Sequence, residues 1–188
     1  MSIVLASGSP RRRELLEGLG LKFAIRPAKG EEMIEEGLGP DKIVCALSAA
    51  KAEEVARDFG EDIIIAADTI VYADGRVLGK PRTEAEAEEM LRLLSGRSHE
   101  VYTGVTVIGG GMTQSEAECT EVFFRELSAE EIRAYVATGE PMDKAGAYGI
   151  QGKASVFITG IKGDYFNVMG LPLCRLGQML KRIGVHLL

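Results

Sequence analysis

The chain contains 188 residues, a length that suits one domain or two small lobes sharing a core. Apolar residues account for 46% of it and charged residues for 27%, which is ordinary for a globular protein and argues against a disordered chain. The formal net charge of −6 argues against a nucleic-acid-binding protein, since such proteins need a basic surface.

The first third of the chain predicts strands and helices in alternation. Residues 2–6 form a short apolar run that predicts a buried strand, and a helix follows with Ser9 as its N-cap and Pro10 at its first position. A second strand is predicted around residues 21–26. After an acidic loop, a long helix is expected over residues 41–59.

Turn and cap signals divide the rest of the chain. In DIIIAADTIVYADGRVLGKP, an apolar run precedes an Asp-Gly turn and a short return strand, which predicts a β-hairpin. Thr83 with Glu86, and Ser128 with Glu131, have the spacing of capping boxes and predict two further helix starts. The other expected elements are antiparallel strands at 99–108 and 116–126, a second hairpin over 154–168 and a final helix over 171–183.

This order predicts an α/β fold. We expect a twisted, mixed β-sheet with helices on both sides, in a single two-lobed domain covering residues 1–188. The three cysteines and two histidines have no zinc-ligand spacing, so we expect buried thiols in a reducing cytoplasm. No signal peptide or apolar stretch of membrane length is apparent, and no membrane association is expected.

Arg11, Arg12 and Arg13 occupy the first turn of the first predicted helix, where the helix dipole is already positive. One interpretation is a solvated basic face. The other is an anion site, in which Ser7, Ser9, the helix N-terminus and the guanidinium groups together bind phosphate.

Two further charged residues interrupt apolar patterns. Lys51 lies in the apolar stripe of the helix over 41–59, so its ammonium group must either extend to solvent or meet an anion. Asp68 lies within the apolar run IIIAADTIVY, where an unpaired carboxylate would be costly. Asp68 therefore has either a buried cationic partner or a catalytic role as general base or metal ligand, and we favour the catalytic role.

The glycine-rich segment GEPMDKAGAYGIQGKA has no periodicity and predicts a loop. It is either a plain surface loop or a ligand-binding one. The Gln151 amide carries a donor and an acceptor, which suits a base edge such as the imide of uracil. Arg11, Arg12, Lys51 and Lys80 supply charge for phosphates, and Glu32 with Asp68 supplies oxygen ligands for Mg²⁺, although no Walker A sequence is present.

Three blocks of the sequence, LASGSPRRREL, AADTIVYADGRVLGKPRT and DKAGAYGIQGKAS with VMGLPL, resemble the Maf family of nucleoside triphosphate pyrophosphatases. The resemblance runs from about residue 3 to residue 177. It implies a two-lobed fold similar to inosine triphosphate pyrophosphatases, with the active site between the lobes. It also implies hydrolysis of a nucleoside triphosphate to the monophosphate and pyrophosphate with Mg²⁺ or Mn²⁺. Family members are cytoplasmic, often homodimeric, and linked to cell-division arrest and to removal of modified nucleotides.

The resemblance also implies a role for each motif residue. Arg11, Thr69 and Gln151 are similar to the branch that prefers dTTP and UTP, and would set the base preference. Asp68 would be the general base or a metal ligand, with Glu32 near the metal, although KGEEM departs from the family's usual loop and Glu31 is an equivalent choice. The phosphate-binding residues would be Ser7, Ser9, Arg12, Lys51 and Lys80.

Two alternatives remain open at this point. Modified pyrimidine triphosphates are as compatible with the sequence as dTTP and UTP. A nucleotide-binding, non-enzymatic regulator of cell division or septum formation would carry the same binding residues without releasing pyrophosphate.

Overall fold

The computed structural model describes residues 2–30 and 37–188. The chain divides into two compact units. The first unit comprises the chain up to Asp68, Thr103–Glu118 and Gly170–Leu188, and the second comprises Thr69–Tyr102 and Cys119–Met169. Three long strands, β3 (Ile63–Ala73), β5 (Ser98–Gly109) and β6 (Met112–Phe124), contribute residues to both units.

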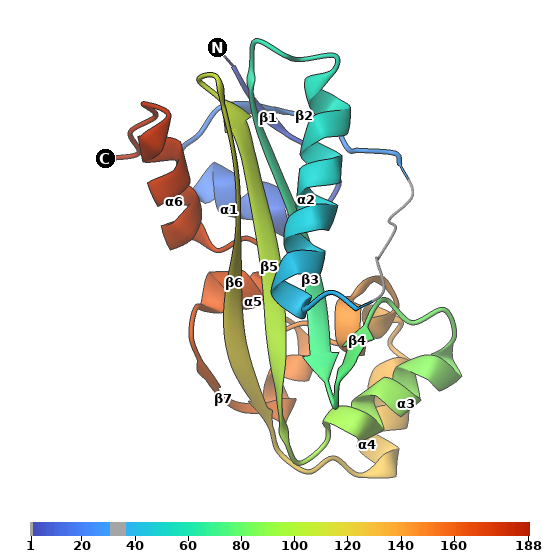
Figure 1. The fold of residues 1–188 in the computed structure, drawn as a ribbon. Helices are drawn as coiled ribbons and strands as arrows, with labels where there is room; N and C mark the ends of the chain where they lie inside the picture. Colours follow the sequence, from blue (N-terminus) through green and yellow to red (C-terminus); the bar gives the residue numbers. More distant parts are fainter. Residues whose placement is uncertain (1, 31–36) are drawn as a thin grey trace. The chain divides into compact units, whose positions relative to one another are not determined.

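The described strands form one mixed sheet of seven strands in the order β2-β1-β3-β5-β6-β7, with β4 also paired to β3 (Figure 1). β1 (Ile3–Leu5) runs parallel to β2 (Phe23–Ile25) on one side and to β3 on the other. Leu5, Ile64 and Ile65 are fully buried. Such unbroken apolar strands are typical of a parallel sheet covered on both faces, and the predicted mixed α/β fold is confirmed.

Among its described residues, the first unit holds the helices α1 (Pro10–Gly18), α2 (Pro40–Ala56) and α6 (Leu173–Arg182). α2 and α1 lie on opposite faces of the sheet (Figure 1). α2 approaches β5 very closely, because a Cβ atom on Gly104 would lie 2.1 Å from the Val44 carbonyl oxygen. The buried hydroxyl groups of Ser48 in α2 and Thr106 in β5 reinforce this contact with a hydrogen bond of 2.8 Å between their oxygen atoms.

The second unit holds β4 (Arg76–Leu78), α3 (Glu84–Leu94), α4 (Ala129–Val136), β7 (Ile158–Lys162) and α5 (Tyr165–Met169). Its loop between α4 and β7 contains three 3₁₀ turns: η1 (Glu140–Asp143), η2 (Ala145–Ala147) and η3 (Lys153–Phe157). The core of this unit includes an aromatic cluster of His99, Phe124, Tyr148, Phe157 and Tyr135.

Local signals in the sequence identified several elements correctly. β3 and β4 form the predicted antiparallel hairpin, and Asp74 and Gly75 both adopt positive φ (48° and 74°), as a type I′ turn requires. Ser128 and Glu131 make the complete capping box. At α3, Thr83 caps as expected, but the Glu86 carboxylate accepts from the backbone N–H of Arg82.

Two expectations are wrong, one on residues 154–168 and one on the cysteines. Residues 154–168 contain η3, β7 and α5 instead of a hairpin, because β7 pairs with β6 and the Asp164 carboxylate accepts the Phe166 N–H at the start of α5. The predicted N-cap position of Ser9 in α1 is confirmed, although the Ser9 side chain makes no capping hydrogen bond. Cys45 is half-buried, whereas Cys119 and Cys174 are exposed, so these thiols are not core residues.

Candidate active site

Arg12 joins three parts of the first unit. Its Nε donates to the Gly170 carbonyl oxygen at 2.8 Å, and its Nη1 donates to the Ser7 hydroxyl at 3.1 Å. The Ser7 hydroxyl also accepts from the Ser9 N–H at 3.3 Å. Ser7 is buried, with 8% of its surface exposed. The guanidinium of Arg12 therefore fixes the loop between β1 and α1 at the N-terminus of that helix.

The neighbouring arginines differ in their surroundings. Arg11 is half-buried. Arg13 is exposed and forms an ion pair with Glu17 at 2.8 Å, and the Glu17 carboxylate raises its pKa. Arg13 thus lies on a solvated face, whereas Arg11 and Arg12 are both half-buried.

Asp68 is buried, with 6% of its surface exposed. It is the last residue of the first unit and lies in the middle of β3, with buried apolar residues on both sides of it in the strand. The Lys51 ammonium group, reaching across from α2, donates to Asp68 Oδ1 in an ion pair. This pair compensates the desolvation of the carboxylate. Of the two predictions for Lys51, contact with an anion is confirmed and extension to solvent is wrong. The same ion pair gives Asp68 a cationic partner.

Thr69, Lys80 and Gln151 belong to the second unit. Thr69 is half-buried in β3, and Lys80 and Gln151 are exposed. Gly146 ties their segments together, since its N–H donates to the Gly79 carbonyl at 3.0 Å. Its φ is +68°, and a Cβ atom there would lie 2.7 Å from a methyl carbon of Val71 in β3. The glycine-rich loop therefore packs against β3, which carries Thr69, and also against Gly79, which precedes Lys80.

The predicted site residues thus form two sets. The first unit holds Ser7, Ser9, Arg11, Arg12, Lys51 and Asp68, and the second holds Thr69, Lys80 and Gln151.

Glu31 and Glu32 lie outside the described residues. The backbone that leads to them is held by Glu54 of α2, whose carboxylate accepts from the N–H groups of Lys29 and Gly30 at 2.7 and 2.9 Å. These hydrogen bonds lower the pKa of Glu54. Over residues 2–30 and 37–188, no three His, Cys, Asp or Glu side chains gather into a metal site. Asp68 is the one predicted metal ligand that the structure describes.

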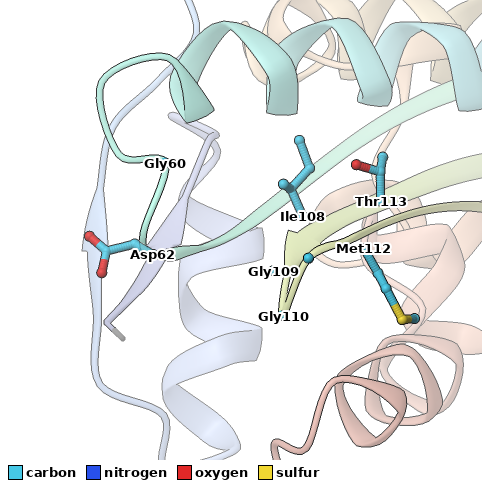
Figure 2. A pocket seen from close by; sticks show the side chains of 8 residues that line it. Gly60, Asp62, Ile108, Gly109, Gly110, Met112 and Thr113 are labelled. Carbon is cyan, nitrogen blue, oxygen red and sulfur yellow. The ribbon is translucent and has the colours of Figure 1, made fainter.

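A small hollow of about 150 Å³ lies at the tip of the β5–β6 hairpin, lined by Gly60, Asp62 and residues 108–113 (Figure 2). The Asp62 carboxylate accepts from the backbone nitrogen of Ser2 at 2.8 Å, so its role is structural. None of the predicted site residues lines this hollow, and it is no candidate for the active site.

Sequence reasoning missed two groups that shape the candidate site. Glu54 holds the backbone of Lys29 and Gly30, and Glu140 holds the segment after Gln151. Both are ordinary acidic residues in polar surroundings, so no pattern of charge or periodicity distinguishes them from solvated side chains.

A family model described as Maf-like protein matches residues 2–183. The chain belongs to the Maf family. Maf proteins similar to it include one from Bacillus cereus strain AH820, 54% identical over 97% of this chain and 96% of its own, and one from Bacillus anthracis, 53% identical over the same shares. Both are named dTTP/UTP pyrophosphatase. The structure of the Staphylococcus aureus Ham1 protein has a TM-score of 0.46 and 16% identity, over 66% of this chain and 72% of its own.

Within the Maf family, the blocks that carry the resemblance correspond to structural features of this chain. SGSPRR comprises the β1–α1 loop and the start of α1, with Arg12 holding the loop, and AADTIVYADG comprises most of β3 and its turn. DKAGAYGIQGKAS is the loop docked by Gly146. No described helix combines the length and the hydropathy that crossing a bilayer would demand.

Proposed function

We propose that this Maf protein is a nucleoside triphosphate pyrophosphatase that hydrolyses dTTP and UTP to the nucleoside monophosphate and pyrophosphate. The observation that carries the proposal is the buried Asp68 carboxylate held by Lys51 in the middle of an apolar strand. A buried carboxylate with a cationic partner is a frequent feature of active sites. The proposal is further supported by relatives at 53–54% identity that are named for this activity.

The triphosphate is proposed to bind at the N-terminus of α1. No acidic residue occupies the first turn of this helix, and the Ser9 side chain caps none of its N–H groups. Those N–H groups and the positive end of the helix dipole favour an anion. Arg11 and Arg12, with Lys51 and Lys80, would supply the positive charge that a triphosphate needs.

Hydrolysis is proposed to proceed by in-line attack of water on the α-phosphorus. The new bond joins the water oxygen to the α-phosphorus, and the bond to the bridging oxygen of the β-phosphate breaks. Asp68 accepts the proton from the water as general base. Lys51 neutralises Asp68 before substrate binds and then donates to phosphate oxygens, which stabilises charge on the departing pyrophosphate.

A divalent cation, Mg²⁺ or Mn²⁺, is part of the proposal. Hard carboxylate oxygen suits both ions, and magnesium sites often use one or two carboxylates together with substrate phosphates. Asp68 fits this role, with Glu32, or Glu31, as the second carboxylate. The bound cation would offset negative charge on the phosphates and on the leaving pyrophosphate.

Base preference is assigned to Thr69, Gln151 and Arg11. The Gln151 side chain is exposed in the docked loop, so its amide is available to a ligand. An amide offers a donor and an acceptor that match the imide edge of thymine and uracil. Modified pyrimidines with the same edge are further substrates under this proposal.

We also propose a cytoplasmic location and a homodimer. The exposed thiols of Cys119 and Cys174 suit a reducing compartment, where disulfides do not form.

The test is a panel of natural and modified triphosphates assayed for pyrophosphate release with Mg²⁺ and with Mn²⁺. The proposal expects the highest kcat/KM for dTTP, UTP or a modified relative of either. A preference for purines would overturn the roles of Gln151 and Thr69. Nucleotide binding without hydrolysis of any triphosphate would favour the non-enzymatic regulator.

A further inference from the structure

One carboxylate closes the loop that carries Gln151. Glu140 stands at the first position of η1, and its side chain accepts from the backbone N–H of Lys153, with 3.2 Å to each carboxylate oxygen. Its Oε1 also accepts from the Tyr135 hydroxyl at 3.1 Å. Glu140 therefore joins the beginning of the loop to the residue two places after Gln151.

The backbone beside Gln151 is shaped to fit this carboxylate. Gly152 adopts φ +87°, and a Cβ atom there would lie 2.7 Å from Glu140 Oε1. The Gly152 carbonyl accepts from the Ser155 hydroxyl at 2.7 Å. The positive φ favours glycine at position 152, and a larger residue there would also displace the Glu140 carboxylate from its present position.

Lys144 supports the same stretch from within the loop. Its ammonium group donates to the Glu140 carbonyl at 2.7 Å, and its side chain is only 14% exposed. A Cβ atom on Gly149 would lie 2.9 Å from Lys144 Cε, so the lysine side chain runs directly against this part of the loop. The segment from Gly149 to Lys153 consequently has supports on either side of Gln151.

The contact of the Glu140 carboxylate with the Lys153 N–H, called the clamp below, is anchored in the core of the second unit. Tyr135 is 4% exposed, and its ring packs edge-on against Phe157 with 5.2 Å between centroids. Burial, together with the nearby Glu140 carboxylate, raises the pKa of Tyr135, so its hydroxyl remains a donor at neutral pH. Through Tyr135, the Glu140 carboxylate is therefore anchored to α4 and the core as well as to the loop.

We propose that Glu140 is a positioning residue for base selection: it holds the backbone on the C-terminal side of Gln151 and thereby fixes the point from which the Gln151 amide reaches the base. This inference rests on the proposed function, because base recognition by Gln151 is part of that proposal. Thymine and uracil offer an acceptor at O4 and a donor at N3, whereas cytosine offers a donor at N4 and an acceptor at N3. A held backbone places the Gln151 amide at one position relative to the base edge, whereas a mobile backbone lets the amide adapt to either edge.

The kinetic test compares dTTP with dCTP in Glu140→Ala. We expect the ratio of kcat/KM for dTTP over dCTP to fall by about tenfold or more, the scale of one lost hydrogen bond to a charged group. The loss should arise mainly from a higher KM for dTTP. Glu140→Gln keeps an acceptor oxygen for the Lys153 N–H and should restore most of the ratio. Glu130→Gln, an exposed change on α4, is the matched control and should leave the ratio unaltered.

A second readout does not depend on activity. Hydrogen–deuterium exchange at the Lys153 amide should be faster in Glu140→Ala than in the wild type, and Glu130→Gln should match the wild type. If Glu140→Ala does not fold, Tyr135→Phe, which removes one of the donors to Glu140, is tested in its place and should show the same changes at smaller size.

The outcomes separate the two proposals. A wild-type protein that hydrolyses no triphosphate overturns the proposed function, while exchange at Lys153 still tests the clamp. Unchanged exchange in Glu140→Ala overturns the clamp itself. Faster exchange with an unaltered dTTP-to-dCTP ratio, or an equal loss for both substrates, overturns the role in base selection.

Discussion

The contact of α2 with β5 makes Gly104→Ala the most quantitative test of the packing that positions Lys51. A Cβ atom at residue 104 would lie 2.1 Å from the oxygen and 2.3 Å from the carbon of the Val44 carbonyl. Ordinary contacts between such atoms exceed about 3.4 Å, so the backbones must separate by roughly 1 Å. The obstructing atoms are backbone and cannot rotate away, which means that α2 itself must shift.

Overpacking of this kind destabilises proteins by about 1–3 kcal/mol. For a chain of this size, each kcal/mol lowers Tm by about 2–4 °C. Lys51 lies two turns along the same helix, so its ion pair with Asp68 should loosen and kcat should fall together with stability.

Urea unfolding followed by far-UV circular dichroism measures the loss of stability, and pyrophosphate release from dTTP measures the loss of activity. Gly18→Ala in α1 is the matched control, because a Cβ atom there meets nothing within 4 Å. It should leave the free energy of unfolding unchanged or raise it by up to about 1 kcal/mol. A Gly104→Ala protein as stable and as active as the wild type would refute the reasoning from this contact.

Three further predictions follow from single residues. Asp68→Asn should lower kcat for dTTP by about 10²–10⁴-fold at saturating Mg²⁺, as expected for loss of a general base, and near-normal turnover would contradict that role. Gly146→Ala, at φ +68° and with its Cβ 2.7 Å from Val71, should lower the free energy of unfolding in urea by about 1–3 kcal/mol. Burial lowers the pKa of His99 from 6.5 to about 4. Between these pH values the imidazole binds a proton in the unfolded chain but not in the folded one, so the free energy of unfolding should fall as pH drops from 6.5 towards 4. His99→Gln should remove this component, worth up to about 3 kcal/mol, and equal pH dependence in both proteins would contradict it.

The elements that sequence reasoning found are those with local determinants. Asp74-Gly75 determines its own turn, and Ser128 with Glu131 forms a cap within one helical turn. The prediction of a hairpin over residues 154–168 is wrong because the secondary structure of this segment depends on partners that are distant in the sequence. β7 pairs with β6, joining Glu121 to Lys162, and the Asp164 N–H donates to the hydroxyl of Thr120. No pattern within the segment itself contains that information.

The candidate site divides in the same way. Lys51 and Asp68 were found because each breaks an apolar pattern, but their pairing across 17 residues required the packing of α2 on the sheet. Glu140 breaks no pattern. Its contacts are with Gly152 and with the N–H of Lys153, which are 12 and 13 residues away in the chain. Residues that act by holding the backbone of another segment leave little trace in a single sequence.

The most direct test of the central claim is hydrolysis of dTTP in ¹⁸O-labelled water, with the products followed by ³¹P NMR. Attack of water on the α-phosphorus predicts dTMP that carries the label and pyrophosphate that does not. Label in pyrophosphate, formation of dTDP with orthophosphate, or binding of dTTP without any product would contradict the account.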